Sequence, residues 1–267
     1  MKGACKMKSK RLILSVIVAL AGFLPQTKAG MILDSADGYA VLAHDTVTST
    51  GLTVINGDLG VYPGIAVTGF GPGIVNGAIY AGVPAAQLAL ADAGIAYLTL
   101  AGEAVTQDLT GQNLGGLTLA PGVKKFNTDA FLTGILTLDA QGDSNARFDF
   151  QIGTTLITAP GASVLLINGA EADNVYWQVG SSATLDLGTA FEGTIIAYQS
   201  IGMNAGASLE GRALALNGAV TLDDNVITAD GNIDTPEPGT FWLMAVCASV
   251  FGAWQRLAMW QRKAARA

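Results

Sequence analysis

The chain has 267 residues, of which 50% are hydrophobic and 13% are charged, and its formal net charge is −7. Most basic residues lie near the two ends, so residues 30–235 hold 4 basic and 20 acidic residues, a balance of −16. Such an acidic body repels phosphate backbones, which argues against a nucleic-acid partner. Cys5 and Cys247 both lie in terminal segments, which excludes a disulfide or a cysteine-ligated zinc site inside the body.

Residues 1–29 have the three-part pattern of a secretory signal peptide. A basic start is followed by the apolar run LILSVIVALAGFL and by a small-residue exit with Thr27 and Ala29. We expect cleavage before Gly30 and export of the mature chain. The alternative is an uncleaved anchor, for which the apolar run is short.

Short apolar runs dominate residues 30–230 and alternate with Gly, Asn and Asp, a pattern typical of short strands joined by turns. Segments 187–193 and 205–211 align with each other at a spacing of 18 residues, which suits one coil of three strands. Such coils must stack on neighbours in parallel ladders to bury their apolar sides. Asn-Gly pairs, expected at the corners of the coils, begin at Asn56, Asn76, Asn168 and Asn217.

Residues 84–107 break the strand pattern. Leu88, Ala91, Ile95 and Leu98 recur at helical spacing, and Pro84 suits a first helical turn. We therefore expect one helix that lies along the solenoid and covers an apolar flank. Gly94 within this helix costs about 1 kcal/mol relative to Ala, which a tight contact would offset.

The body resembles the microbial ice-binding protein family from about Tyr39 to Thr228. The matching stretches, in the family's order, include YAVLAHDTVTSTGLTVINGDLGVYPG, LTGQNLGGLTLAPGV and LEGRALALNGAVTLDDNVIT. The resemblance implies a mostly β fold, a discontinuous β-solenoid built as a right-handed β-helix of triangular coils. It also implies one long α-helix packed alongside, within a domain that spans 30–230, and one flat face that docks on ice.

Ice presents a periodic, uncharged lattice, so docking relies on shape match and ordered water. A rigid array of Thr, Ser and Ala suits both requirements. The family often carries a Thr-x-x-Thr or Thr-x-x-Asn step on this face, and Thr50-Gly51-Leu52-Thr53 fits it. We align this step with segments 160–163, 187–190 and 205–208, which depart from the pattern and thin the hydroxyl ladder. The predicted ice-binding residues are Thr50, Thr53, Ser163, Thr189 and Ser208.

The C-terminal region resembles a PEP-CTERM sorting signal of Gram-negative bacteria. After a linker at 231–235, Pro236-Glu237-Pro238 precede an apolar segment at 241–254 and an arginine-containing tail, within residues 236–267. The resemblance implies handling by an exosortase, a membrane enzyme that removes the tail during export, and an extracellular or cell-surface location. The alternative is a plain membrane anchor with the basic tail on the cytoplasmic side.

Residues typical of enzymes, metal sites and cofactor sites are sparse. His44 is the only histidine and has no partner for a triad or a metal site. Asp139, Asp143 and Asn145 do not match an EF-hand and indicate a turn in which side chains bond their own backbone. Asp223 and Asp224 are adjacent, so on a strand they point to opposite faces and make a poor catalytic carboxylate pair. We therefore expect no enzyme activity, no cofactor and no metal.

Two functions stay open at this point. One is an exported ice-binding protein whose partner is the ice crystal surface. The alternative is a structural or adhesive cell-surface protein of the same fold, whose partner is an extracellular polymer. The thinned hydroxyl ladder and the sorting signal favour the alternative. An enzyme acting on polysaccharide is a third class, and only four basic residues in the body argue against a uronate substrate.

Overall fold

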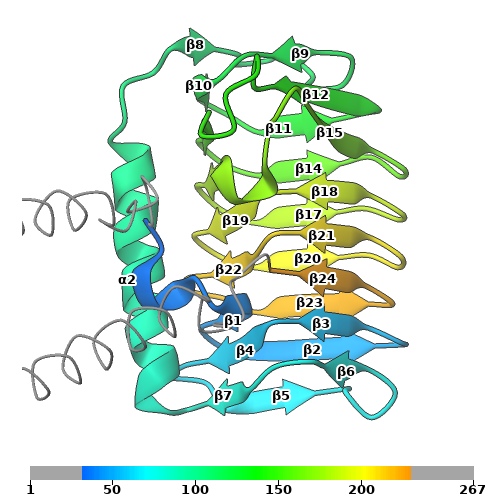
Figure 1. Cartoon of the computed structure of the whole chain (residues 1–267). Helices are drawn as coiled ribbons and strands as arrows, with labels where there is room; N and C mark the ends of the chain where they lie inside the picture. The colour runs from blue at the N-terminus through cyan, green and yellow to red at the C-terminus, as the bar shows by residue number, and fades with distance from the viewer. Residues whose placement is uncertain (1–31, 230–267) are drawn as a thin grey trace, which may run out of the picture.

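The computed structural model describes residues 32–229, and three parallel sheets wrap around one elongated core (Figure 1). The predicted signal peptide, linker and sorting signal lie outside the described residues. All pairings between strands are parallel, as the repeat pattern predicts. The predicted solenoid is therefore confirmed, including the 18-residue step, since Ala190 pairs with Ser208 and Glu192 with Glu210.

Sheet A, followed from the bottom of the rod in Figure 1 to its top, consists of β7 (Ile79–Ala81), β4 (Asp58–Val61), β1 (Tyr39–Ala43), β22 (Ala213–Ala215), β19 (Thr194–Ala197), β16 (Val175–Val179), β13 (Phe148–Ile152), β10 (Gly122–Phe126) and β8 (Gln107–Asp108). Sheet B, in the same direction, consists of β5 (Ala66–Thr68), β2 (Thr46–Thr50), β23 (Val220–Asp223), β20 (Ile201–Met203), β17 (Ala183–Leu185), β14 (Leu156–Thr158) and β11 (Ala130–Leu132). Sheet C consists of β6 (Ile74–Val75), β3 (Val54–Asn56), β24 (Val226–Thr228), β21 (Ser208–Glu210), β18 (Ala190–Glu192), β15 (Ser163–Ile167), β12 (Ile135–Asp139) and β9 (Thr118–Leu119).

The path of the chain along the rod is discontinuous. After the short 3-10 helix η1 (Asp34–Ala36), the first coils run downward in Figure 1 from β1 to β7. Helix α2 (Pro84–Ala101) then carries the chain upward along sheet A, and the remaining coils descend from β8 to β24. The coil of β22, β23 and β24 closes the rod by pairing with β1, β2 and β3.

The interior is filled by thin layers of side chains, because each short strand sends only one to three residues inward. Phe150 and Trp177 stack with ring centroids 3.8 Å apart, and Trp177 Nε1 donates a hydrogen bond of 2.9 Å to the carbonyl of Glu192. The four Asn-Gly pairs lie at corners, as predicted. Asn168 and Gly169 have φ values of 53° and 88°, a left-handed conformation that Asn and Gly tolerate best.

Helix α2 confirms the helix prediction but corrects its length and orientation. It begins at Pro84 as expected and ends at Ala101, six residues early, because the following residues join the sheet A ladder at β8. The predicted apolar stripe points outward: Leu88, Ile95 and Leu98 are 57%, 62% and 70% exposed. The face against sheet A is instead lined by residues that are mostly alanine, namely Ala86, Ala89, Ala93, Ala96 and Leu100.

Small side chains explain this orientation. Alanine brings the helix backbone close to the strands, whereas Leu and Ile on that side would hold it away. The predicted tight contact at Gly94 is wrong, because a methyl group added there would meet open space. The side chain of Ser35 bonds the carboxylate of Asp92 and thereby ties η1 to the helix.

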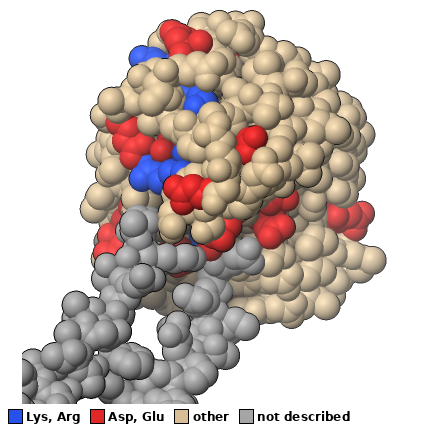
Figure 2. Space-filling view, turned by 45° about the horizontal axis from the view of Figure 1, so that its top comes forward, with Lys and Arg blue, Asp and Glu red and all other residues tan. Residues whose placement is uncertain are grey.

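Partly buried ion pairs fasten the residues that follow η1 and α2 to sheet A. Arg212 is 1% exposed and contacts Asp37 and Asp173 at 2.9 Å each. Arg147 bridges Glu103, just after α2, and Asp149. Burial raises the pKa of Asp149 to about 7, although Arg147 opposes this shift. In the view of Figure 2, charged side chains gather on one part of the surface and a broad uncharged area lies beside them.

Candidate functional site

Sheets B and C present the two open faces of the rod, because α2 covers sheet A. In each sheet the strands run across the rod and stack along its length, nearly parallel to one another (Figure 1). Each face is therefore a regular series of rungs. Neighbouring rungs in a parallel sheet are about 4.8 Å apart. Each outward position therefore forms a ladder with a fixed repeat, and the residue types along a ladder decide what that face can bind.

The middle of sheet B carries one outward ladder of uncharged side chains, which we call the central ladder. From the bottom of the rod to the top it consists of Thr68, Thr48, Thr221, Gly202, Thr184, Ile157 and Phe131. Three threonines occupy consecutive rungs at the lower end, and Thr184 follows after Gly202. Their hydroxyl groups can hold water while their methyl groups restrict it.

A second ladder of small residues flanks the central ladder on the side of sheet A. Its rungs are Thr46, Ala219, Ser200, Ser182 and Thr155. The hydroxyl groups of Ser200 and Ser182 accept hydrogen bonds from the backbone N–H of Ala219 and Ser200, respectively, so the serines join neighbouring coils. These bonds hold the two serine hydroxyls in place beside the central ladder.

A row of carboxylates lies beside the central ladder, at the ends of the sheet B strands that lead to sheet C. Hydrogen bonds hold these carboxylates in place. Thr50 Oγ1 donates to Asp223 at 2.7 Å, and Asn204 Nδ2 donates to Asp186 at 2.8 Å. The bond from Asn204, with a backbone N–H bond from Leu187, lowers the pKa of Asp186 below its usual value. These acids border the central ladder without interrupting it.

Sheet C is less suited to a neutral lattice. Glu192 and Glu210 are register neighbours on this face, and the carboxylate of Glu210 is exposed while that of Glu192 is half-buried. Its other outward ladder mixes small residues with large aliphatic ones, and Ile135 and Val226 are 54% and 48% exposed. Thr228, Asn56 and Asn76, joined by side-chain hydrogen bonds, continue the ladder of Glu192 and Glu210 toward the bottom of the rod.

The five predicted site residues do not share one face. Thr50 lies at the end of β2 in sheet B, whereas Ser163 and Ser208 belong to sheet C. Thr53 and Thr189 are fully buried, with 0% exposure, and so cannot touch a docked surface. Their hydroxyls are used inside the rod: Thr53 Oγ1 accepts from the backbone N–H of Asn225, and Thr189 Oγ1 lies 2.8 Å from Thr158 Oγ1.

The predicted alignment of the Thr50–Thr53 step is wrong by one residue. Val54 lies in register with Val226, Ser208, Ala190 and Ser163, so Thr53 corresponds to Thr189 and not to Ala190. A one-residue slip moves every side chain to the opposite side of a strand, which explains the mixture of buried and exposed residues. The inward apolar row of Ile55, Ile227, Leu209 and Phe191 sets this register, and aligning on it would have found the correct one.

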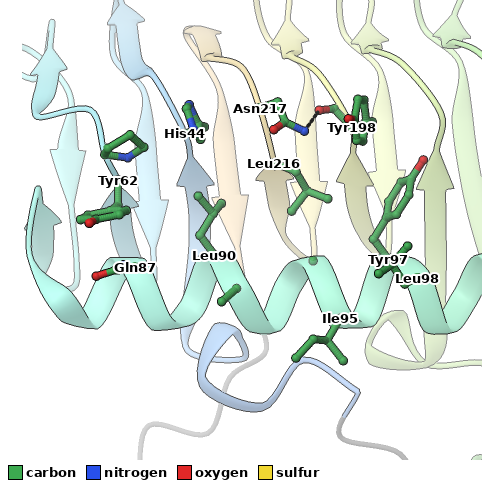
Figure 3. A pocket seen from close by; sticks show the side chains of 13 residues that line it. His44, Tyr62, Gln87, Leu90, Ile95, Tyr97, Leu98, Tyr198, Leu216 and Asn217 are labelled. Carbon is green, nitrogen blue, oxygen red and sulfur yellow. Dashed lines mark hydrogen bonds between the residues drawn. The ribbon is translucent and has the colours of Figure 1, made fainter.

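An apolar groove of about 650 Å³ lies between α2 and the corner where sheet A turns into sheet B (Figure 3). Tyr62, Tyr97 and Tyr198 line it together with His44 and aliphatic side chains. His44 Nδ1 lies 2.7 Å from Asp45 and has no nucleophile beside it among the lining residues. Within residues 32–229, no group of three or more His, Cys, Asp or Glu side chains is placed to hold a metal ion.

The predicted turn at Asp139 to Asn145 is confirmed. Asp139 Oδ1 accepts from the backbone N–H of Gln141, and Asp143 Oδ1 accepts from that of Asn145, each at 2.9 Å. Hydrogen bonds from Asn168 and Gln141 lower the pKa of Asp139. These acids therefore stabilise a corner of the coil. Between residues 32 and 229, no helix is long and apolar enough to cross a membrane.

A stack of triangular coils that the chain builds in two separate runs, with helix α2 covering one side, defines the class of discontinuous β-solenoids. In this chain, sheet B adds a central ladder that is uncharged and rich in hydroxyl groups. The family model described as ice-binding-like matches residues 41–228, and the chain belongs to this family. An ice-binding protein of Nostoc sp. is 49% identical over 226 residues, which cover 84% of either chain.

Solved structures agree with this membership. An ice-binding protein from an Antarctic biological consortium is 47% identical with a TM-score of 0.72, covering 73% of this chain and 89% of the other. One from the Antarctic ascomycete Antarctomyces psychrotrophicus is 40% identical with a TM-score of 0.72, covering 74% and 97%.

Proposed function

We propose that the chain binds ice through sheet B and acts without catalysis. The observation that carries this proposal is the uncharged central ladder, in a chain that belongs to the ice-binding-like family. Water held by threonine hydroxyls at a fixed repeat can join an ice lattice, whereas charged side chains would bind liquid water instead. Because the folded rod is rigid before it docks, it loses little conformational entropy on binding.

A pair of matched substitutions tests which face docks. Thr221→Tyr places a bulky ring in the central ladder of sheet B, and Thr137→Tyr places the same ring on sheet C. We expect Thr221→Tyr to reduce affinity for ice planes and recrystallisation inhibition, and Thr137→Tyr to leave both unchanged. A wild-type protein without any effect on ice growth would refute the function itself.

We also propose that residues 1–29 are a signal peptide and that residues 236–267 are a sorting signal removed by an exosortase. The support is the order of basic, apolar and small residues at the first end, and of Pro236-Glu237-Pro238, apolar segment and basic tail at the second. Mass spectrometry of the exported protein should find a chain that starts at Gly30 and lacks the tail. An intact C-terminus in the membrane fraction would instead indicate a plain anchor.

A structural or adhesive role at the cell surface is the second candidate. The observation in its favour is the upper part of the central ladder, where Ile157 and Phe131 replace hydroxyl-bearing residues. Under this alternative, the partner is an extracellular polymer. Deletion of the gene would then change cell aggregation, while the purified protein would have no effect on ice.

A further inference from the structure

The two ends of the rod differ in how they close. At the top, the loop between β8 and β9 folds over the core, so that Leu109, Leu114 and Leu119 are at most 5% exposed. At the bottom, β5, β6 and β7 form the last rungs of their sheets, and no further strand among residues 32–229 lies beyond them (Figure 1). The bottom of the rod is therefore an open end, which we call the open coil.

The open coil exposes side chains that belong to the core. Val67, Val75 and Ile79 pair with Val47, Ile55 and Leu59 of the coil above. Those three partners are 0% exposed and point inward, so the residues below them also point inward. Because another coil is missing, Ile79 is 50% exposed and Val67 and Val75 are only half-buried. Phe70, in the loop between β5 and β6, packs against this core layer but covers it only in part, so the rest of the layer faces solvent.

The backbone of the open coil is also unpartnered on one side. The last strand of a sheet carries N–H and C=O groups that bond water until another strand edge pairs with them. Proteins commonly protect such edges with charged side chains, yet residues 59–91 contain no Asp, Glu, Lys, Arg or His. The rest of the body is strongly acidic, so this end is where a second copy meets the least electrostatic repulsion.

We propose that two copies of this chain associate end to end through their open coils. A two-fold axis perpendicular to sheet B would place β5 beside β5 of the second copy in antiparallel orientation, and β7 beside β6 of that copy. Such a self-complementary contact closes as a dimer. A second copy fits better than a single unrelated strand. Its own β5, β6 and β7 present three free edges, arranged as the sides of a triangle of the same size.

The contact is small, since the three strands hold only three, two and three residues. We therefore expect a weak dimer that forms at high concentration. In this arrangement the two B sheets lie in one plane, and their central ladders join at Thr68 of either copy. The resulting gain in ice affinity rests on the proposed function, whereas the association itself does not.

Sedimentation velocity of the exported mature protein at concentrations up to about 1 mM tests the proposal, a range in which weak dimers populate. Wild type should show a sedimentation coefficient that rises with concentration. Ile79→Lys and Val75→Lys should remove this rise, because each brings a like charge into both halves of the contact. Leu98→Lys on the exposed side of α2 is the matched control and should keep it.

Circular dichroism and a thermal midpoint close to wild type will show that the variants fold. Ile79→Thr, which suits a strand but removes apolar area, should weaken association by a smaller factor. A monomer at every concentration overturns the proposal, as does association that Ile79→Lys leaves unchanged or that Leu98→Lys removes. A wild-type dimer without any effect on ice would refute the proposed function and leave the end-to-end contact standing.

Discussion

Gly202 interrupts the threonines of the central ladder, so its replacement offers a gain-of-function test. It lies in β20 between Thr184 and Thr221, and a Cβ added there meets no atom within 4 Å. Gly202→Thr would therefore fit without moving its neighbours. The substitution would create five consecutive threonine rungs from Thr184 to Thr68, a row about 19 Å long at the parallel-strand repeat.

The expected size of the effect follows from two separate contributions. Replacing a strand glycine should stabilise the fold by about 0.5–1 kcal/mol, since glycine loses more backbone freedom on folding. For a domain of this size, that corresponds to a rise in Tm of about 1–4 °C. One added water-mediated hydroxyl contact, at about 0.5–1.5 kcal/mol, should raise ice affinity roughly two- to tenfold.

Ala190→Thr is the matched control on sheet C. Ala190 is an exposed strand residue between Ser163 and Ser208, so this change completes a hydroxyl ladder on the other face. Ice-plane affinity and recrystallisation inhibition should rise for Gly202→Thr and stay constant for Ala190→Thr. A rise with Ala190→Thr alone would move the docking face to sheet C, and no change with Gly202→Thr would refute the argument from hydroxyl spacing.

Three further predictions concern stability. Thr158→Val removes the partner of the buried Thr189 hydroxyl and should lower the free energy of unfolding by about 1–3 kcal/mol in urea titrations, with ice activity unchanged. Arg212→Met removes the cation that contacts Asp37 and Asp173 and should cost about 2–3 kcal/mol by the same measurement, less than for a fully buried pair because both carboxylates are partly exposed. The pKa of Asp139 is lowered by its bond from Asn168, so its stabilising contribution is present above the unfolded pKa near 3.9 and is lost as pH falls through the folded value. Asp139→Asn should thus flatten the decline of Tm between pH 4 and pH 2, and an identical decline in the variant would contradict this assignment.

Local patterns in the sequence were enough to predict the coils, because short apolar runs, Gly-rich corners and an 18-residue repeat each reflect contacts between neighbours. The start of the helix at Pro84 and the Asx turn at Asp139 were predicted for the same reason. The resemblance added the discontinuous chain path, which the pairing of β1 with β22 confirms. No local pattern specifies that pairing, since its partners lie more than 170 residues apart.

Only the tertiary structure decided which side chains reach each face. The step Thr50–Thr53 looked like an exposed pair, yet the inward row through Ile55 fixes a register in which Thr53 is buried. The stripe of Leu88, Ile95 and Leu98 looked like a packing face, yet the alanine side of α2 allows a closer approach to sheet A. Composition and periodicity determine that a residue belongs to a strand or a helix, whereas the fit of whole coils and layers determines the direction in which it points.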